Sequence, residues 1–163
     1  MQERKLMEMV EAAGTIAIAG HVRPDGDCVG SCLAVCNYIT EQYPEKTVDV
    51  YLETPPVKFS YLKQFERISS DSNTGKQYEL CICLDSGDRE RLGNNVVYLD
   101  TAKTSICIDH HITNKGYAAS NFVNASASAT CEFLYDFLDE EKISKEVAEC
   151  IYTGIIHDTN VFK

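Results

Sequence analysis

The sequence predicts an α/β fold with a mainly parallel sheet and helices on both of its faces. Short apolar runs bounded by turn residues alternate with segments whose apolar residues recur at helical spacing. Several of the apolar runs end on Asp or His. The chain has 163 residues, which is enough for one domain with a substantial core and short for two.

The expected elements follow one another with clear stop signals. A first amphipathic helix should end before Gly14, and the Pro-Pro pair at 55–56 should interrupt the chain before another helix. The expected helices cover residues 5–13, 28–41, 59–65, 127–138 and 145–156, with a single helical turn at 88–92. The expected strands cover residues 15–19, 47–52, 78–84, 96–99 and 104–108.

Composition places the chain among ordinary soluble globular proteins, with 44% hydrophobic and 25% charged residues. No apolar run is long enough for a membrane span, and the charged start does not resemble a signal peptide, so we expect a cytoplasmic protein that does not contact a membrane. The net charge of -10 disfavours binding to long duplex nucleic acid, which requires Lys or Arg against phosphates.

The eight cysteines are expected to pack in the core as free thiols. Cys28, Cys32 and Cys36 recur every four residues and would form one stripe on a helix, whereas Cys81 and Cys83 would share one face of a strand. The sequence has no Cys-x-x-Cys pair of the kind used for zinc or redox chemistry.

The segment 21–27 directly follows a predicted strand and concentrates three metal-ligand types. His21, Asp25 and Asp27 lie within seven residues, and Pro24 and Gly26 permit a turn that points several side chains at one place. An ordinary Pro-Asp-Gly surface turn is the competing interpretation of this segment.

Further acidic and His residues close other apolar runs and favour the metal interpretation. Asp85, Asp158 and the tripeptide Asp109-His110-His111 each follow such a run. In open α/β sheets the carboxyl ends of the strands gather along one edge, where ligands bind. Four carboxylates gathered there would repel one another and raise their own pKa values unless cations filled the site.

Together these segments resemble the motifs of the DHH phosphoesterase family, which is named for an Asp-His-His motif. The four matching motifs are His21-Val-Arg-Pro-Asp25-Gly-Asp27, Leu-Asp85-Ser-Gly-Asp, Asp109-His110-His111 and Gly-Ile-Ile-His-Asp158-Thr. They occur in the family's order, and the resemblance covers residues 14–163. Within the family, the segments 111–114 and 128–132 look most like the bacterial nano-RNases, which also remove the 3'-phosphate of phosphoadenosine phosphate.

The resemblance implies a site for two divalent metal ions. The implied ligands are His21 and Asp25 for one ion, Asp27, His110 and Asp158 for the other, and Asp85 as the bridge between them. Oxygen ligands mixed with imidazole suit manganese best, with magnesium and cobalt as the other candidates. Two ions about 4 Å apart can activate a water molecule and clamp phosphoryl oxygens.

Asp109 and His111 should do other work than His110, because adjacent residues of an extended segment point in opposite directions and cannot all ligate one ion. We expect Asp109 to orient an imidazole such as that of His21, and His111 to contact a phosphate or donate a proton to the leaving oxygen. Packing or turn roles are the alternative.

Three further residues are candidates for substrate contact, namely Arg23, Asn114 and Thr130. Thr130 lies near the start of a predicted helix, where backbone N–H groups favour an anion, although a capping role is the common alternative. His157 and Asn160 depart from the nano-RNase pattern, which more often has a small residue or Thr before the fourth-motif Asp and Gly after the Thr that follows it.

Residues 1–163 are therefore expected to form a DHH metal-binding catalytic domain, truncated before the C-terminal substrate domain that family members normally carry. The expected activity is manganese-dependent hydrolysis of short oligoribonucleotides, phosphoadenosine phosphate or another small phosphorylated nucleotide. The alternatives are a cyclic-dinucleotide, polyphosphate or pyrophosphate hydrolase and a metal-binding module without turnover. A homodimer is among the assemblies to be expected.

Overall fold

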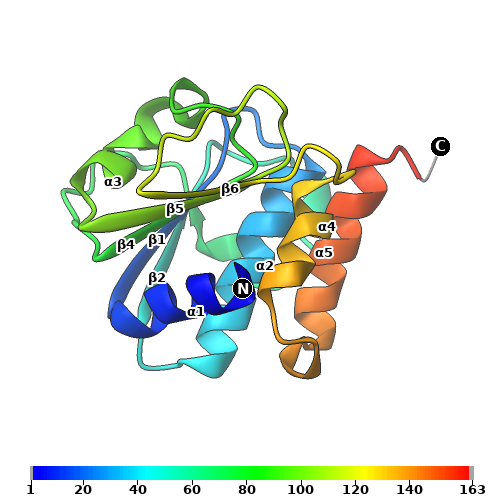
Figure 1. Cartoon of the computed structure of the whole chain (residues 1–163), viewed down its shortest axis with the longest axis horizontal. Helices are drawn as coiled ribbons and strands as arrows, with labels where there is room; N and C mark the ends of the chain where they lie inside the picture. The colour runs from blue at the N-terminus through cyan, green and yellow to red at the C-terminus, as the bar shows by residue number, and fades with distance from the viewer. Residues whose placement is uncertain (1, 162–163) are drawn as a thin grey trace.

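The fold is built on a six-stranded, all-parallel sheet (Figure 1), and the computed structural model describes residues 2–161. The strand order is β3-β2-β1-β4-β5-β6, so the order reverses between the neighbours β1 and β4. The strands are β1 Thr15–Ala19, β2 Thr47–Tyr51, β3 Ile68–Ser69, β4 Leu80–Leu84, β5 Thr104–Asp109 and β6 Ser120–Val123. The expected parallel α/β architecture is confirmed.

Helices cover both faces of the sheet, but unequally. Figure 1 shows α1, α2, α4 and α5 gathered on one side and α3 on the other. The α-helices are α1 Gln2–Ala12, α2 Gly26–Gln42, α3 Val96–Thr101, α4 Thr130–Leu134 and α5 Lys145–Asp158. Short 3-10 turns occur at η1 Val57–Phe59, η2 Phe65–Arg67, η3 Glu90–Asn95, η4 Tyr135–Phe137 and η5 Glu140–Lys142.

Two hydrophobic clusters form the core on either side of the sheet. The larger cluster joins residues such as Ile16, Ile82 and Ile106 of the strands to the four helices of the crowded side. The smaller one contains alternate strand residues, including Cys81 and Cys83, together with Tyr98 of α3. Side chains alternate between the two faces because successive strand residues point in opposite directions.

All eight cysteines are free and buried, as expected from their spacing. Cys28, Cys32 and Cys36 lie on α2 and belong to the larger cluster. Burial raises the pKa of the Cys36 thiol to about 12, so these thiols stay protonated and pack as small hydrophobic groups.

Several local predictions were wrong. Residues 96–99 form part of helix α3 instead of a strand, and the expected helix at 59–65 is replaced by the 3-10 turns η1 and η2. The helix expected at 127–138 begins at Thr130 and ends in η4, whereas β3 and β6 were not predicted at all. The Val-Val-Tyr run is rich in residues that favour strands. In the structure it forms a helix that packs against the sheet face carrying the smaller hydrophobic cluster.

Helix α5 packs closely against α2 and α4. A Cβ atom on Gly30 of α2 would lie 2.5 Å from the carbonyl oxygen of Cys150 in α5, and one on Gly154 of α5 would lie 2.2 Å from the sulfur of Cys131 in α4. Only glycine permits this approach, because a Cβ contact below 3.0 Å requires something to shift. The last residue of α5 therefore reaches the beginning of α2.

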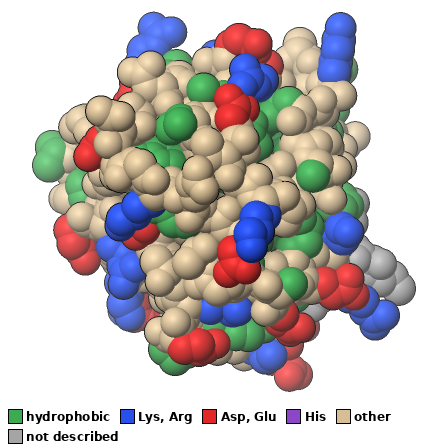
Figure 2. All heavy atoms as spheres, turned by 90° about the vertical axis from the view of Figure 1, so that its left-hand side faces the viewer, with side chains coloured by type: hydrophobic (Ala, Val, Ile, Leu, Met, Phe, Trp, Pro, Cys, Tyr) green, Lys and Arg blue, Asp and Glu red, His purple; other side chains and the backbone are tan. Residues whose placement is uncertain are grey.

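The outer surface does not display a large patch of one charge on the side shown in Figure 2. Acidic and basic side chains are interspersed there among apolar and other atoms. This mixture gives no track for a long polyanion on that face. Within residues 2–161, no helix is long and apolar enough to cross a membrane.

Candidate metal centre

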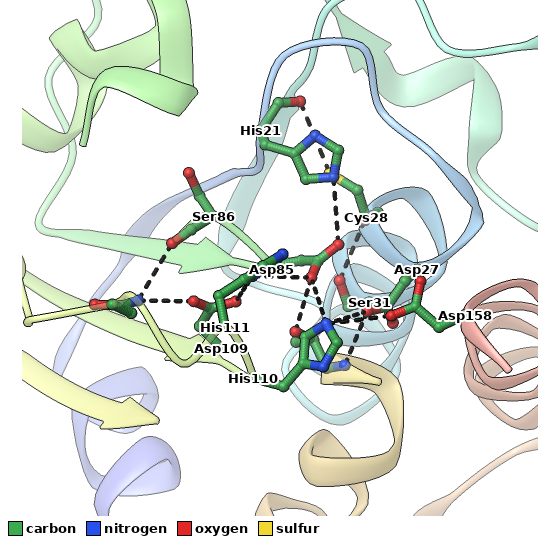
Figure 3. Close-up of polar contacts among 12 residues, drawn as sticks. His21, Asp27, Cys28, Ser31, Asp85, Ser86, Asp109, His110, His111 and Asp158 are labelled. Atoms are coloured by element: carbon green, nitrogen blue, oxygen red, sulfur yellow. Dashed lines mark hydrogen bonds and ion pairs between the residues drawn. The ribbon is translucent and has the colours of Figure 1, made fainter. Parts of the chain in front are cut away.

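Five of the six expected metal ligands are labelled in Figure 3, where they meet at the carboxyl edge of the sheet: His21, Asp27, Asp85, His110 and Asp158. His21 follows β1 and Asp85 follows β4, at the point where the strand order reverses. Ligands of open α/β sheets bind in the crevice at such a point. His110 follows β5, while Asp158 arrives from the C-terminal end of helix α5 and not from a strand.

Asp85 lies at the middle of this group, between His21 and His110 (Figure 3). Its Oδ2 is 3.4 Å from His21 Nε2, and its Oδ1 is 3.5 Å from His110 Nε2. The side chain is only 2% exposed. The backbone of Asp85 has a φ of 59°, in the left-handed region that residues other than glycine rarely adopt and that is stabilised here by the surrounding structure. This conformation turns one carboxylate toward two imidazoles.

His21 and Asp25 form one side of the centre. The ring Nδ1 of His21 donates to the Val22 carbonyl oxygen at 2.6 Å, which leaves Nε2 to face Asp25 at 3.6 Å and Asp85 at 3.4 Å. Burial opposes protonation of His21, but the two carboxylates outweigh it and raise its pKa above the ordinary value. Burial also opposes ionisation of Asp25, yet His21 and the Cys28 N–H lower its pKa to about 2.

Asp27, His110 and Asp158 form the other side. His110 Nε2 lies 3.6 Å from Asp27 Oδ2 and 3.2 Å from Asp158 Oδ2. Its Nδ1 donates to the Ala127 carbonyl oxygen at 3.3 Å, so Nε2 again points into the centre. The contact with Asp158, against the opposing effect of burial, raises the pKa of His110 to about 9.

Asp27 is completely buried and is held by the beginning of helix α4. The backbone N–H groups of Thr130 and Cys131 donate to its two carboxylate oxygens at 2.8 and 2.9 Å. The pKa of Asp27 is nevertheless raised to about 9, mainly by burial and to a smaller extent by repulsion from Asp85 and Asp158. The carboxylates thus repel one another as their clustering predicts, and added positive charge would relieve this repulsion.

Asp109 orients His111, not His21 as expected. The two side chains approach to 2.7 Å between Asp109 Oδ1 and His111 Nδ1, and the Asn114 amide donates to Asp109 Oδ2 at 2.8 Å. Strand β5 ends at Asp109, so the chain turns before His110 and His111, and both imidazoles lie near Asp85. The expectation of alternating directions failed because it assumed extended backbone through all three residues.

The remaining candidates occupy different positions around the centre. Thr130 is fully buried, and its hydroxyl donates to Asp85 Oδ1 at 3.0 Å. Arg23 is exposed in the loop after β1 and has a φ of 50°. Asn160 has a φ of 49°, a conformation that Asn tolerates better than most residues.

Residues 15–155 match the N-terminal domain of the DHH family. The chain belongs to the DHH family. This range contains His21, Asp25, Asp27, Asp85 and His110.

Among individual DHH relatives, the chain is 32% identical over 163 residues to a protein of Streptococcus mutans named "Probable bifunctional oligoribonuclease and PAP phosphatase NrnA". It is 31% identical over 163 residues to the Bacillus subtilis "Bifunctional oligoribonuclease and PAP phosphatase NrnA". These matches cover 98% and 97% of the chain and 50% of each relative. The chain therefore spans about half the length of the curated relatives it matches.

A solved structure shows the same fold. An exopolyphosphatase-related protein from Bacteroides fragilis is 26% identical and superposes with a TM-score of 0.88, covering 99% of this chain and 51% of the other. The likeness extends over nearly all of the chain, so the site edge described above belongs to the shared fold.

The donor set fits the metal dependence of the DHH family. Within the described part of the chain, Asp27, His110 and Asp158 offer ligand atoms within 4.8 Å of one another, and so do Asp85, His110 and His111. A third such group adds the Cys28 sulfur to His21 and Asp85. From the sequence, core packing was expected for all the cysteines, and Cys28 was the likeliest exception because it is adjacent to Asp27.

Proposed function

We propose that this chain is a metal-dependent phosphoesterase that acts on short oligoribonucleotides or on a small nucleotide such as 3'-phosphoadenosine 5'-phosphate. One observation carries the proposal most directly. His21 and His110 both engage a carbonyl oxygen through Nδ1 and present Nε2 to the opposite oxygens of Asp85. A carbonyl can only accept, so each Nε2 is the nitrogen left to bind a cation.

Two divalent ions, with manganese the preferred metal, account for this arrangement. We assign His21 and Asp25 to one ion, and Asp85 to a bridging position. Asp27, His110 and Asp158 complete the set at the second ion. When bound, such ions activate water and stabilise charge on phosphoryl oxygens without a protein nucleophile. Imidazole among carboxylates favours manganese over magnesium, and cobalt is compatible with the same donors.

The residues around the ligands would position the reacting groups. Asp109 fixes the Nδ1 side of His111, so its Nε2 is free to donate a proton to the leaving oxygen or to bind a phosphate. The side chain of His111 is 44% exposed, as a residue that meets substrate must be. Asn114 and Thr130 support this role indirectly by orienting Asp109 and Asp85.

The names of the two relatives support the nucleotide substrates, since both NrnA proteins are described as oligoribonuclease and PAP phosphatase. We further propose that residues 1–163 constitute the metal-binding catalytic domain. A cytoplasmic location and a homodimer remain predictions, and Arg23 remains a proposed substrate contact.

A second candidate activity is hydrolysis of a phosphoanhydride such as polyphosphate. The description of the Bacteroides fragilis protein as "exopolyphosphatase-related" favours it. The same donor set would serve either linkage, because the ions that it would hold would act on phosphoryl oxygens, which both linkages contain.

The test is to assay the purified chain with manganese against a ribodinucleotide, phosphoadenosine phosphate, a cyclic dinucleotide and polyphosphate. We expect hydrolysis of the first two, and loss of at least about a hundredfold in kcat/KM in Asp85→Asn, which keeps the size of the bridging side chain but removes its charge. Preferential turnover of polyphosphate would select the second candidate. Manganese binding without turnover of any substrate would contradict an enzymatic role for this chain.

A further inference from the structure

A pocket lined by aromatic side chains opens beside the metal centre. Its volume is about 290 Å³, near the lower end of the range of about 300–1,000 Å³ typical of ligand sites. The residues that line it, hereafter the aromatic pocket, are Lys58, Phe59, Tyr61, Tyr152, Thr153, Ile156 and His157. They come from the segment after β2 and from the last turns of α5.

One imidazole separates this pocket from the metal-ligating loop. The ring of His157 packs on the backbone of Gly26, since a Cβ atom placed on Gly26 would lie only 2.4 Å from His157 Cγ. Gly26 lies between Asp25 and Asp27, and His157 directly precedes Asp158. The chain has four histidines, of which three belong to the centre and the fourth forms this shared wall.

The aromatic pocket has a buried floor, formed by Phe59, and exposed aromatic side chains at its rim. Phe59 is 3% exposed, and its ring meets the ring of His157 edge-on at 5.1 Å between centroids. Tyr61 is held by a hydrogen bond of 2.7 Å between its hydroxyl and Thr153 Oγ1. Tyr61 and Tyr152 are nevertheless 62% and 60% exposed, which leaves most of each side chain accessible to a ligand.

The charge of the lining differs from that of the chain. The protein carries a net charge of -10, yet the aromatic pocket is lined by Lys58 and His157 and by no Asp or Glu. The Nζ of Lys58 lies 5.3 Å from the centre of the Phe59 ring, which keeps a cation over the pocket. A ligand that has both a negative charge and an aromatic ring could place its charge near Lys58 and its ring against the tyrosines.

We propose that the aromatic pocket binds the nucleobase of a nucleotide substrate whose phosphate lies at the metal centre. This inference rests on the proposed function and specifies where one base of that substrate is held. Stacking between bases and aromatic side chains tolerates any base, because every base has a π-face. The pocket would therefore favour nucleotides over inorganic polyphosphate without selecting a particular sequence.

The size of the pocket and its position favour a base over a second protein chain. A cavity of this volume accommodates one ring system, whereas a stable protein interface buries about 1,200–2,000 Å². Through His157, which lines the pocket and packs on Gly26, the pocket adjoins the segment that carries Asp25 and Asp27.

The experiment compares Tyr152→Ala with the wild-type chain on two substrates, a ribodinucleotide and the corresponding phosphodiester that lacks a base at one position. We expect the ratio of kcat/KM for the two substrates to fall roughly 5- to 100-fold in the variant, mainly through KM for the dinucleotide. Tyr152→Phe, which keeps the ring, should restore the ratio. Tyr135→Ala is the matched control, since Tyr135 is 45% exposed and contacts Glu140 away from this pocket.

A direct binding measurement separates this proposal from the proposed function. Adenosine 5'-monophosphate is titrated into the wild type and Tyr152→Ala by calorimetry, and sedimentation records the oligomeric state of both. Weaker binding in the variant supports the pocket even if no substrate is turned over. Equal binding and an unchanged substrate ratio would overturn the proposal. If nucleotide binding and the substrate ratio are unchanged but Tyr152→Ala alters the oligomeric state, the proposal is also overturned, and Tyr152 is identified as part of a subunit contact.

Discussion

The hydroxyl group of Thr130 donates a 3.0 Å hydrogen bond to Asp85 Oδ1, while the backbone N–H of the same residue donates to Asp27 Oδ2 at 2.8 Å. One buried residue at the start of α4 thus holds two carboxylates that we assign as metal ligands. This arrangement connects the packing of a short helix to the geometry of the centre, because partners behind the ligands fix their orientation.

Replacing Thr130 by Val removes the hydroxyl and keeps the shape of the side chain. We expect manganese affinity to fall roughly 10- to 100-fold, since outer partners of metal ligands have effects of this size. Calorimetric titration measures the change. Thr101→Val is the control, because Thr101 is exposed and its hydroxyl donates to the Val97 carbonyl oxygen of its own helix. Equal affinities in Thr130→Val and wild type would show that the backbone alone positions the ligands.

Two manganese ions should bind per chain, and Asp85 should matter to both. In Asp85→Asn we expect stoichiometry to fall below two while the metal-free protein stays folded, because Asn retains tolerance for the left-handed φ of 59°. Asp85→Ala should lose the ions and also some stability. Elemental analysis and thermal unfolding separate the two effects. Full stoichiometry in both variants would disprove the bridging assignment.

The eight buried thiols should react slowly with a bulky thiol reagent in the native protein and rapidly after unfolding in urea. Burial raises the pKa of Cys107 and of Cys150 to about 12, so little thiolate is present at neutral pH. Mild oxidation should likewise leave the chain without crosslinks. Fast native modification of several cysteines would contradict the packing described here.

The parallel sheet and the cluster at its edge were predictable because strand period, turn residues and strand-end ligands are local signals. The pairing of Asp109 with His111 was not, since it depends on the turn at the end of β5. β6 was missed because its burial alternates only between half-buried and exposed residues, which leaves little apolar pattern. Residues 96–99 resembled a strand in composition, and tertiary packing made them helical.

The close approach of α2 and α5 predicts that Gly30→Ala is destabilising. The added Cβ would lie 2.5 Å from a backbone oxygen that cannot rotate away, so we expect a loss of about 1–3 kcal/mol in the free energy of unfolding. Gly14→Ala is the control, since its Cβ would meet the movable carboxylate of Glu79 at 3.1 Å. Denaturant unfolding compares them, and equal stability would mean that the helices can separate without cost.

Loading the centre with manganese should release protons. Contact with carboxylates raises the pKa of His110 to about 9, and burial with carboxylate repulsion does the same for Asp27, so both hold protons at pH 7 in the metal-free protein. Metal ligands must be deprotonated, and affinity should therefore rise with pH until about pH 9. Calorimetry at pH 7 in buffers of different ionisation enthalpy counts the protons, and Asp27→Asn should release about one fewer.

The stability of the metal-free protein should depend on Asp27 and His110 as well. It should fall as the pH rises, whereas manganese affinity should rise. Because the folded pKa of Asp27 lies above its ordinary value of 3.8, the stabilisation from its bound proton is fully present below about pH 4 and is lost as the pH rises through about 9. Manganese should cancel this loss by replacing the protons. We therefore expect the increase in Tm on adding manganese to be larger at pH 9 than at pH 6, measured by differential scanning calorimetry at one metal concentration. An increase that is the same at both pH values, together with no proton release, would mean that these side chains do not bind the ion.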